Sequence, residues 1–385
     1  MSARRLAVML ASLAAVALLV LAFSSSLAAG GLAGFKFIGS VDTMKLSKDQ
    51  VTGGFTSDDA QAVNLTASMA VTHITVDTPL EYPSVMAAWA EKIHNVGKHV
   101  WFRLGSSNGG NLAHGDSSRA SGYKIPYDGY SEFGPGYLTT LHKLMLAHPG
   151  LIRAGDILDG DSEVENSTWW KANYGCRVQQ ACTPCPEISH MTSAAYPCSP
   201  VSEFNRFLQV MTRQENRDLV ALGVSPCATP SSTNCVLTQV HSVDPGTGMH
   251  ELSNSTVQAM GNLVTIDAYP DRGTTSPTGA ATKWLRNLQN WYEAWKARGL
   301  TVTILVGEWG YSNKLNVGDA TQAAVIQAEV NAFPSVPYLL GANYWVGPGW
   351  EGDGGYTQIF THASGSWKFR PAAPKVSSLY AAMNR

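Results

Sequence analysis

The chain carries little charge and no excess of either sign. Asp, Glu, Lys and Arg make up only 15% of its 385 residues, and 27 basic against 29 acidic side chains leave a formal net charge of −2. A chain this close to neutrality lacks the basic surface that binds nucleic acid, which excludes that class of function. Its 36 glycines follow no three-residue period, so a collagen-like chain is excluded too. The hydrophobic fraction of 44% instead predicts a large folded core and excludes intrinsic disorder.

Motifs of several other chemistries are absent or lack their context. The one G-x-S-x-G match, Gly105-Ser106-Ser107-Asn108-Gly109, leads into a long connection and not directly into an expected helix, which leaves serine hydrolase chemistry without support. The sequence has no H-E-x-x-H, and its ten histidines are scattered without the spacing of metal ligands. The acidic turn at 351–355 lacks the alternating ligands of a calcium loop. We therefore expect neither a metal nor a cofactor.

One long apolar run is present, at the N-terminus. Arg4 and Arg5 precede an apolar stretch over 6–23, and Ser26-Leu27-Ala28 has the small-x-small form of a signal peptidase site. We predict that residues 1–29 are a cleaved signal peptide, with an uncleaved membrane anchor as the alternative. No second apolar run of this length follows, so in either case 30–385 is expected to be extracellular.

The six cysteines cluster between positions 176 and 235, which agrees with export. They are Cys176, Cys182, Cys185, Cys198, Cys227 and Cys235. An even number in an exported chain predicts disulfides, and Cys227 with Cys235 would close a short loop. A zinc site at Cys182 and Cys185 is the weaker alternative, because the mirrored C-x-x-C that it needs is absent.

Strand-like and helix-like segments alternate along the rest of the chain. Strands are expected at 35–41, 71–76, 98–104, 156–160, 218–224, 262–268, 300–306 and 338–345. Helices are expected at 58–70, 84–96, 137–147, 201–217, 254–261, 280–298, 320–332 and 375–384. Eight such units predict a single-domain α/β protein, a (β/α)₈ barrel over 30–385. The alternative, a doubly wound open sheet, usually has a glycine-rich phosphate turn after its first strand, and none is present here.

Connection lengths favour the barrel and indicate where its site lies. Connections from helix to strand are short, whereas those after the third, fifth and eighth strands run to about 30 residues and that after the fourth to about 40. Barrel enzymes build their sites from the loops at the strand C-termini. We therefore expect the site there, walled by long βα loops that carry disulfides. The aromatic stripe of the helix at 280–298 is interpreted as core packing rather than as a sugar platform.

Carboxylates follow two of the expected strands. Glu308 comes directly after the seventh, and the fourth leads into Asp161-Ser162-Glu163-Val164-Glu165. Strands four and seven of a barrel face each other across its mouth. Two opposed carboxylates are what glycosidic bond cleavage requires, one to protonate the leaving oxygen and one to attack the anomeric carbon.

Three further motifs accompany these carboxylates: Gly307-Glu308-Trp309-Gly310, Asp267-Ala268-Tyr269-Pro270 and Asn343-Tyr344-Trp345. With them, the chain from about position 35 onward resembles the (β/α)₈ retaining glycoside hydrolases that keep the acid/base on strand four and the nucleophile on strand seven. The resemblance implies that Glu308 is the nucleophile and Glu163 the acid/base. Many members have Asn-Glu-Pro-Glu where this chain has Ser162-Glu163-Val164-Glu165, so Glu165 stays as the alternative acid/base.

The resemblance also implies supporting roles. Tyr269 would orient Glu308 through a hydrogen bond, and Arg103 at the end of the third strand would keep Glu308 ionised. Arg103 could instead form a buried ion pair with Asp77 or Asp156.

Four more side chains are expected to bind substrate. Trp345 offers an apolar face for a pyranose ring, and Trp309 stands beside the expected nucleophile. Asp42 and Asp77, which end the first two strands, are candidates for binding sugar hydroxyls.

Together these features predict a secreted retaining glycoside hydrolase acting on a poly- or oligosaccharide. The low charge and the 11 Trp and 14 Tyr favour an uncharged glycan as the partner. A non-catalytic carbohydrate-binding barrel and an inverting hydrolase are the alternatives. The only membrane association expected is a possible N-terminal anchor, and no feature of the sequence predicts an oligomeric state.

Overall fold

The computed structural model describes residues 37–80, 82–104, 137–160, 200–232, 234–243, 252–269, 276–311, 318–349 and 357–384. The predicted signal peptide lies outside these residues, as do Cys176, Cys182, Cys185 and Cys198. In the described part of the chain, no helix is both long and apolar enough to span a membrane.

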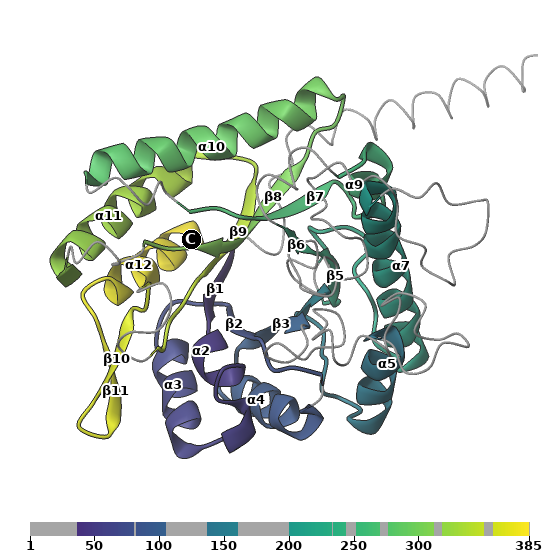
Figure 1. Ribbon diagram of the computed structural model, residues 1–385, viewed down its shortest axis with the longest axis horizontal. Coiled ribbons are helices and arrows are strands. Elements are labelled where there is room, and N and C mark those ends of the chain that lie inside the picture. Colours follow the sequence, from purple (N-terminus) through teal and green to yellow (C-terminus); the bar gives the residue numbers. More distant parts are fainter. Residues whose placement is uncertain are drawn as a thin grey trace, which may run out of the picture.

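A nearly closed parallel barrel forms the centre of the molecule (Figure 1). Its strands are β1 (Ile38–Asp42), β2 (His73–Val76), β3 (His99–Leu104), β4 (Ile157–Gly160), β5 (Leu237–Val240), β6 (Ser242–Val243), β7 (Leu263–Asp267), β8 (Thr303–Trp309) and β9 (Leu339–Tyr344). They pair in the order β5-β4-β3-β2-β1-β9-β8-β7-β6, and every pair is parallel. Only His241 separates β5 from β6, so the two ends of this order adjoin and together make the fifth of eight barrel strands. The predicted (β/α)₈ barrel is confirmed.

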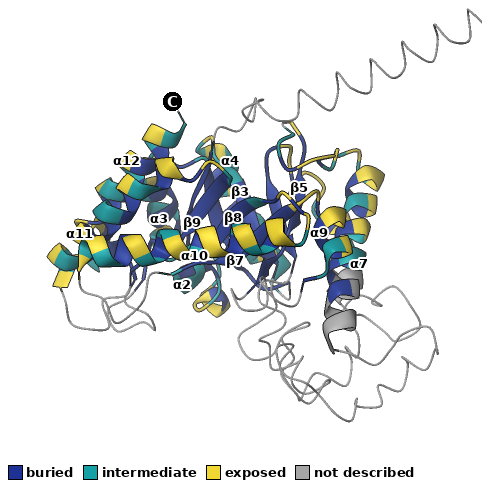
Figure 2. Cartoon of the chain, turned by 90° about the horizontal axis from the view of Figure 1, so that it is seen from above, coloured by how far each residue is buried: buried dark blue, intermediate teal, exposed yellow. Residues whose placement is uncertain are grey.

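Helices surround the barrel, with their exposed residues on the outward faces (Figure 2). They are α3 (Ser57–Ala67), α4 (Pro83–Asn95), α5 (Tyr137–Ala147), α7 (Pro200–Ala221), α9 (Asn254–Ala259), α10 (Pro277–Ala297), α11 (Gly318–Ala332) and α12 (Ala373–Met383). Shorter elements are α2 (Met44–Ser47) and the 3₁₀ turns η2 (Val51–Gly53) and η6 (Phe333–Ser335). An antiparallel hairpin, β10 (Phe360–Ala363) and β11 (Ser366–Phe369), lies between β9 and α12.

Local sequence explains where these helices begin and end. Thr56 and Asp59 form a capping box before α3, in which each side chain accepts a hydrogen bond from the other residue's backbone N–H. Ser276 caps α10 by accepting from the N–H of Gly279, with a proline at the first helical position. Gly299 follows α10 with φ of 81°, a left-handed conformation that stops a helix at little cost.

Two apolar clusters fill the structure on either side of the strands. The larger lies between strands and helices and contains the stripe of α10, with Trp284, Trp291 and Trp295 buried, which confirms the interpretation of that stripe as core. The smaller lies inside the barrel. The side-chain period of two places Trp101 and Ile157 of this inner cluster on the same strand faces as Arg103 and Asp159. The inner cluster is therefore the apolar floor beneath the charged residues at the barrel mouth.

The fifth strand was predicted in the wrong place. Helix α7 continues through Ala221, and the strand is Leu237–Val240, after the cysteine loop. A short apolar run such as 218–224 fits the end of a helix as well as a strand, and periodicity does not separate the two. Consequently the connection from this strand to α9 is about ten residues rather than about 30.

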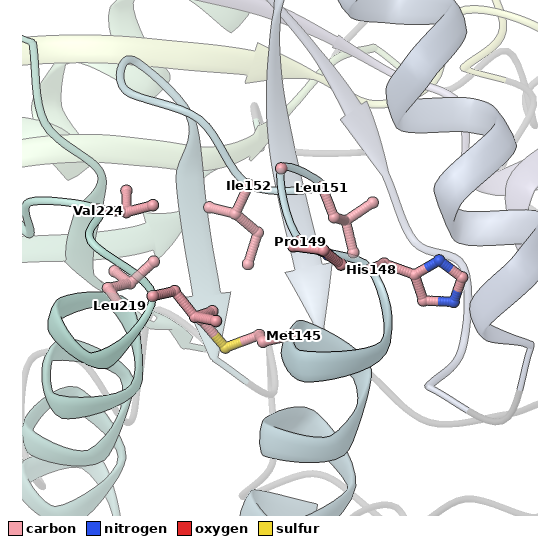
Figure 3. A pocket seen from close by; sticks show the side chains of 9 residues that line it. Met145, His148, Pro149, Leu151, Ile152, Leu219 and Val224 are labelled. Carbon is pink, nitrogen blue, oxygen red and sulfur yellow. The ribbon is translucent and has the colours of Figure 1, made fainter.

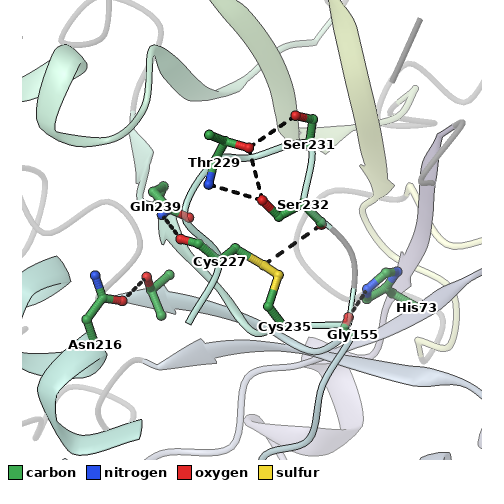
Figure 4. The surroundings of a disulfide bond; sticks show 10 residues. His73, Gly155, Asn216, Cys227, Thr229, Ser231, Ser232, Cys235 and Gln239 are labelled. Carbon is green, nitrogen blue, oxygen red and sulfur yellow. Dashed lines mark hydrogen bonds between the residues drawn. A yellow bond between two sulfur atoms is a disulfide. The ribbon is translucent and has the colours of Figure 1, made fainter. Parts of the chain in front are cut away.

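The disulfide between Cys227 and Cys235 is present as predicted (Figure 4). It lies in the connection from α7 into β5, where the Gly155 N–H donates to the Cys235 carbonyl at 2.8 Å. This connection is at the N-terminal end of the barrel, so the expectation that the disulfide stiffens a βα loop of the site is wrong for this pair. The two cysteines join the inner apolar cluster instead.

Candidate active site

Glu308 lies near the C-terminal end of β8 and is held at both carboxylate oxygens. The Tyr269 hydroxyl, just after β7, donates to Oε2 at 2.6 Å. The Arg103 guanidinium at the end of β3 donates from Nη1 to Oε1. Both hydrogen bonds predicted from the sequence are therefore present. They leave the Glu308 side chain 14% exposed, enough for contact with a bound molecule.

A bulge in β8 aims Glu308 at this position. The pairing with β7 runs Ile266 to Val306 and then Asp267 to Glu308, so Gly307 is the extra residue. A Cβ at Gly307 would collide with Ser242 Oγ and Asp267 Oδ1. Glycine is thus required immediately before Glu308.

Arg103 is the centre of an acidic cluster contributed by five strands or their ends. Its side chain is only 3% exposed. Besides Glu308, it lies 3.5 Å from Asp42 Oδ2, 3.8 Å from Asp77 Oδ1, 3.8 Å from Asp159 Oδ2 and 4.0 Å from Asp267 Oδ2. Burial alone would lower the pKa of Arg103, but the surrounding carboxylates, Glu308 foremost, raise it well above its ordinary value. Arg103 is therefore permanently charged.

One guanidinium faces five carboxyl groups in this cluster, and the pKa values of two of them are raised. Burial raises the pKa of Asp42, and Glu308 adds to that rise. Burial and then the adjacent Asp42 raise the pKa of Asp77 well above its usual range. Burial thus works against the charged forms of both carboxyl groups, which Arg103 partly offsets.

Of the two alternative ion-pair partners expected for Arg103, the structure places only Asp77 close to it, at 3.8 Å. Asp156 is not close to it, because it lies just before β4 at the opposite end of the barrel, where it accepts from His94 Nε2 at 3.0 Å and from the Val100 N–H at 2.8 Å.

Asn343 on β9 supports the cluster from below, a role that the sequence did not reveal. Its Nδ2 donates to Asp42 Oδ2 and to the Gly307 carbonyl, both at 3.0 Å. Its Oδ1 accepts from Thr75 Oγ1 at 2.9 Å. The sequence feature that could have indicated this role is the position of Asn343 in the Asn343-Tyr344-Trp345 motif. With the Met44 N–H donating to Asp42 Oδ1 at 2.7 Å, the oxygens of Asp42 are engaged by the protein itself.

The two tryptophans expected at the site differ in placement. Trp345 follows β9 beside Tyr269, whose ring meets it edge-on at 6.3 Å between centroids. Lys45 Nζ lies 5.9 Å from the Trp345 ring centroid, and the peptide between Trp345 and Val346 is cis. Trp309 is fully buried in the outer core, where its Nε1 donates to the Tyr380 hydroxyl at 3.2 Å. The structure thus brings Trp345, but not Trp309, to Glu308's neighbourhood.

The two expected candidates for the acid/base, Glu163 and Glu165, lie outside the residues that the structure describes. Among the residues described, no group of three or more His, Cys, Asp or Glu side chains is arranged to hold a metal.

A small apolar pocket lies at the opposite end of the barrel, between the C-terminal ends of α5 and α7 (Figure 3). It is lined by Met145, His148, Pro149, Gly150, Leu151, Ile152, Leu219, Leu222 and Val224.

Comparison with known proteins identifies the fold. No protein-family model matches the sequence, and no curated protein matches it. Among solved structures, GH5_18 from Streptomyces cattleya in complex with GlcNAc is similar with a TM-score of 0.57 and 13% identity, over 90% of this chain and 80% of that one. A GH5-4 broad specificity endoglucanase from Clostridium longisporum gives 0.56 and 10%, over 92% and 99%. A β-glucosidase from Exiguobacterium marinum gives 0.54 and 8%, over 91% and 98%.

The chain therefore has the (β/α)₈-barrel fold of these glycoside hydrolases. At identities of 8 to 13% the likeness concerns the fold, and the subfamily is left open.

Proposed function

We propose that this protein is a retaining glycoside hydrolase acting on a poly- or oligosaccharide. The observation that carries the proposal is Glu308 itself: a carboxylate at the mouth of a glycosidase-type barrel, with one donor on each oxygen. Hydrogen bonds to both oxygens fix the direction of the carboxylate, which is what a nucleophile needs. The nearby Trp345 supplies an aromatic face for a sugar ring.

In the proposed reaction, Glu308 attacks the anomeric carbon while the glycosidic C–O bond breaks. Glu163 gives its proton to the leaving oxygen, and a glycosyl ester on Glu308 remains. Water then attacks the anomeric carbon, Glu163 takes one of its protons, and the ester bond breaks to restore Glu308. Asp77 is proposed to bind a sugar hydroxyl. Asp42, whose oxygens are engaged by protein donors, is proposed to orient Arg103.

The test is release of reducing sugar from β-glucans, xylans, mannans and galactans by the wild type and by Glu308→Gln. The wild type is expected to act on at least one polymer, and the variant to lose activity by about 10³-fold or more, because the amide is not a nucleophile. Glu329→Gln is the matched control: Glu329 is also buried, but it lies on α11 outside the site, and we expect full activity. Activity that survives in Glu308→Gln would refute the nucleophile assignment. Binding of a glycan without turnover by either protein would favour the non-catalytic barrel.

Two further measurements address the acid/base and the stereochemistry. Glu163→Gln is expected to lose activity while Glu165→Gln retains it, and the reverse result would move the role to Glu165. Proton NMR of the first sugar released is expected to show the substrate's own anomer, as retention demands. Release of the opposite anomer would establish an inverting enzyme.

We also propose that residues 1–29 direct export and that the mature protein is extracellular. The buried disulfide between Cys227 and Cys235 supports this, because disulfides persist in oxidising compartments. N-terminal sequencing of the protein from culture medium tests it, and a cell-bound product that keeps the apolar segment would indicate an anchor.

A further inference from the structure

Asp159 on β4 lies at the seam of the barrel, the place where the fifth barrel strand passes from β5 to β6. The fifth barrel strand changes partner between β5 and β6: β5 pairs with β4, and β6 pairs with β7. At this change the Ser242 N–H and Oγ donate to Asp159 Oδ1 and Oδ2, at 2.9 and 2.6 Å. Trp101 Nε1 donates to Oδ2 as well, at 3.3 Å. A carboxylate on β4 thus takes hydrogen bonds that join β4 to β6 and β3.

This carboxylate is linked to Glu308 by two short routes. The first is electrostatic: Asp159 is the direct neighbour of Arg103 across the β3–β4 pair, and its Oδ2 lies 3.8 Å from Arg103 Nε. The second is steric, because Ser242 Oγ occupies the space that a Cβ at Gly307 would need, immediately before Glu308.

We propose that Asp159 is a positioning residue for the reaction, which holds Arg103 and the bulge of β8 so that Glu308 keeps its direction. This inference rests on the proposed function. Three donors fully engage Asp159 from the protein side, and it is completely buried, so it acts through Arg103 and Ser242 and not on substrate.

The sign of its electrostatic effect follows from the surrounding charges. The charged and titratable groups that face Arg103 and Asp159 are Asp42, Asp77, Glu215, His241, Asp267, Tyr269 and Glu308. Asp159 competes with Glu308 for the guanidinium. Removing its charge leaves the guanidinium to Glu308, and we expect the acidic limb of the pH–rate profile to move to lower pH.

The experiment compares isosteric variants on the glycan found by the activity panel. Asp159→Asn is expected to lower kcat about tenfold or more, leave KM within about twofold, and move the acidic limb to lower pH. Asp156→Asn is the matched control, since Asp156 precedes the same strand, is equally buried and also accepts backbone hydrogen bonds, but lies at the far end of the barrel. The melting temperature of Asp156→Asn is expected to fall, while the acidic limb of its pH–rate profile stays where it is in the wild type.

Ser242→Ala gives an independent test with the opposite sign. It keeps the charge of Asp159 but removes one donor from it, so Asp159 draws Arg103 more strongly and the acidic limb moves to higher pH. If Asp159→Asn does not fold, this variant decides the matter. An unmoved limb in both variants, or an equal shift in Asp156→Asn, would overturn the proposal. Glu308→Gln in the same assay shows whether the proposed function itself fails. Retained turnover in that variant would refute the assignment of Glu308 as nucleophile, and this inference with it.

Discussion

Arg103→Met provides a quantitative test of the acidic cluster. Methionine has a similar length and no charge, so the substitution leaves the buried carboxyl groups of Asp42, Asp77 and Asp267 without their cation. Removing one partner from a buried ion pair typically costs about 3–5 kcal/mol of unfolding free energy. With about 2 °C per kcal/mol for a chain of this length, the melting temperature at pH 7 should fall by about 6–10 °C.

The pH dependence of this loss identifies its cause. Without Arg103, the pKa values of Asp42 and Asp77, already raised by burial, rise further in the folded protein. A carboxyl group whose pKa is higher folded than unfolded destabilises the fold as the pH rises above its unfolded pKa of about 4. At pH 4 the groups are protonated in the folded state, and only the cost of a volume-conserving exchange remains, about 1 kcal/mol or 2 °C.

The assay is thermal unfolding of the wild type and Arg103→Met, followed by circular dichroism from pH 4 to pH 8. A difference that grows with pH supports the account. An equal loss at pH 4 and pH 7 would refute it, because lost packing does not depend on pH. Arg103→Lys keeps the charge without the planar fork, and it should recover much of the stability at pH 7 but little of the activity.

Three other predictions follow from single contacts. Tyr269→Phe removes the hydrogen bond to Glu308 Oε2 and should lower kcat about 10- to 100-fold with little change in KM. Burial, and secondarily a neighbouring histidine, lowers the pKa of His73 to about 3. In the unfolded chain the pKa of this histidine is about 6.5, so below that pH the unfolded state binds a proton that the folded state does not. The free energy of unfolding of the wild type should therefore fall by about 3 kcal/mol between pH 7 and pH 4, and His73→Gln should not show this loss. Replacing Cys227 and Cys235 by serine should cost about 2–3 kcal/mol in urea unfolding and leave kcat unchanged.

Each of these has a result that would contradict it. An unchanged kcat in Tyr269→Phe would mean that Arg103 alone orients Glu308. An acid-side loss of the same size in His73→Gln would assign that loss to other groups. A fall in kcat for the cysteine double variant would show that the N-terminal end of the barrel affects the site, contrary to its placement.

The alternation of strands and helices could be predicted from the sequence because each segment carries its own signal. Seven of the eight expected strands overlap strands of the barrel, and Ser276 and Gly299 mark the ends of α10 locally. The fifth strand could not be predicted, because the run at 218–224 suits either structure and the choice depends on what α7 packs against. At His241 the fifth barrel strand stops pairing with β4 and starts pairing with β7. This change of partner is also set by contacts between residues distant in the sequence.

The site divides in the same way. That Glu308 and Arg103 lie at the barrel mouth follows from the sequence, because each ends an apolar strand and parallel strands end at one edge. Which face each residue occupies does not follow, since the bulge at Gly307 reverses the alternation locally. That bulge turns Glu308 toward Arg103, while Trp309 packs in the outer core.

The sequence by itself therefore determined the barrel, the end at which the proposed site lies and the carboxylate at the centre of the proposal, because these depend on short-range patterns. Only the tertiary structure decided that five acidic side chains share one arginine, and that Asp159 and Ser242 join the seam beside them. Such contacts come from closing the barrel. Closure brings together residues from strands that are distant in the sequence, and their side chains meet only when the strand register is set.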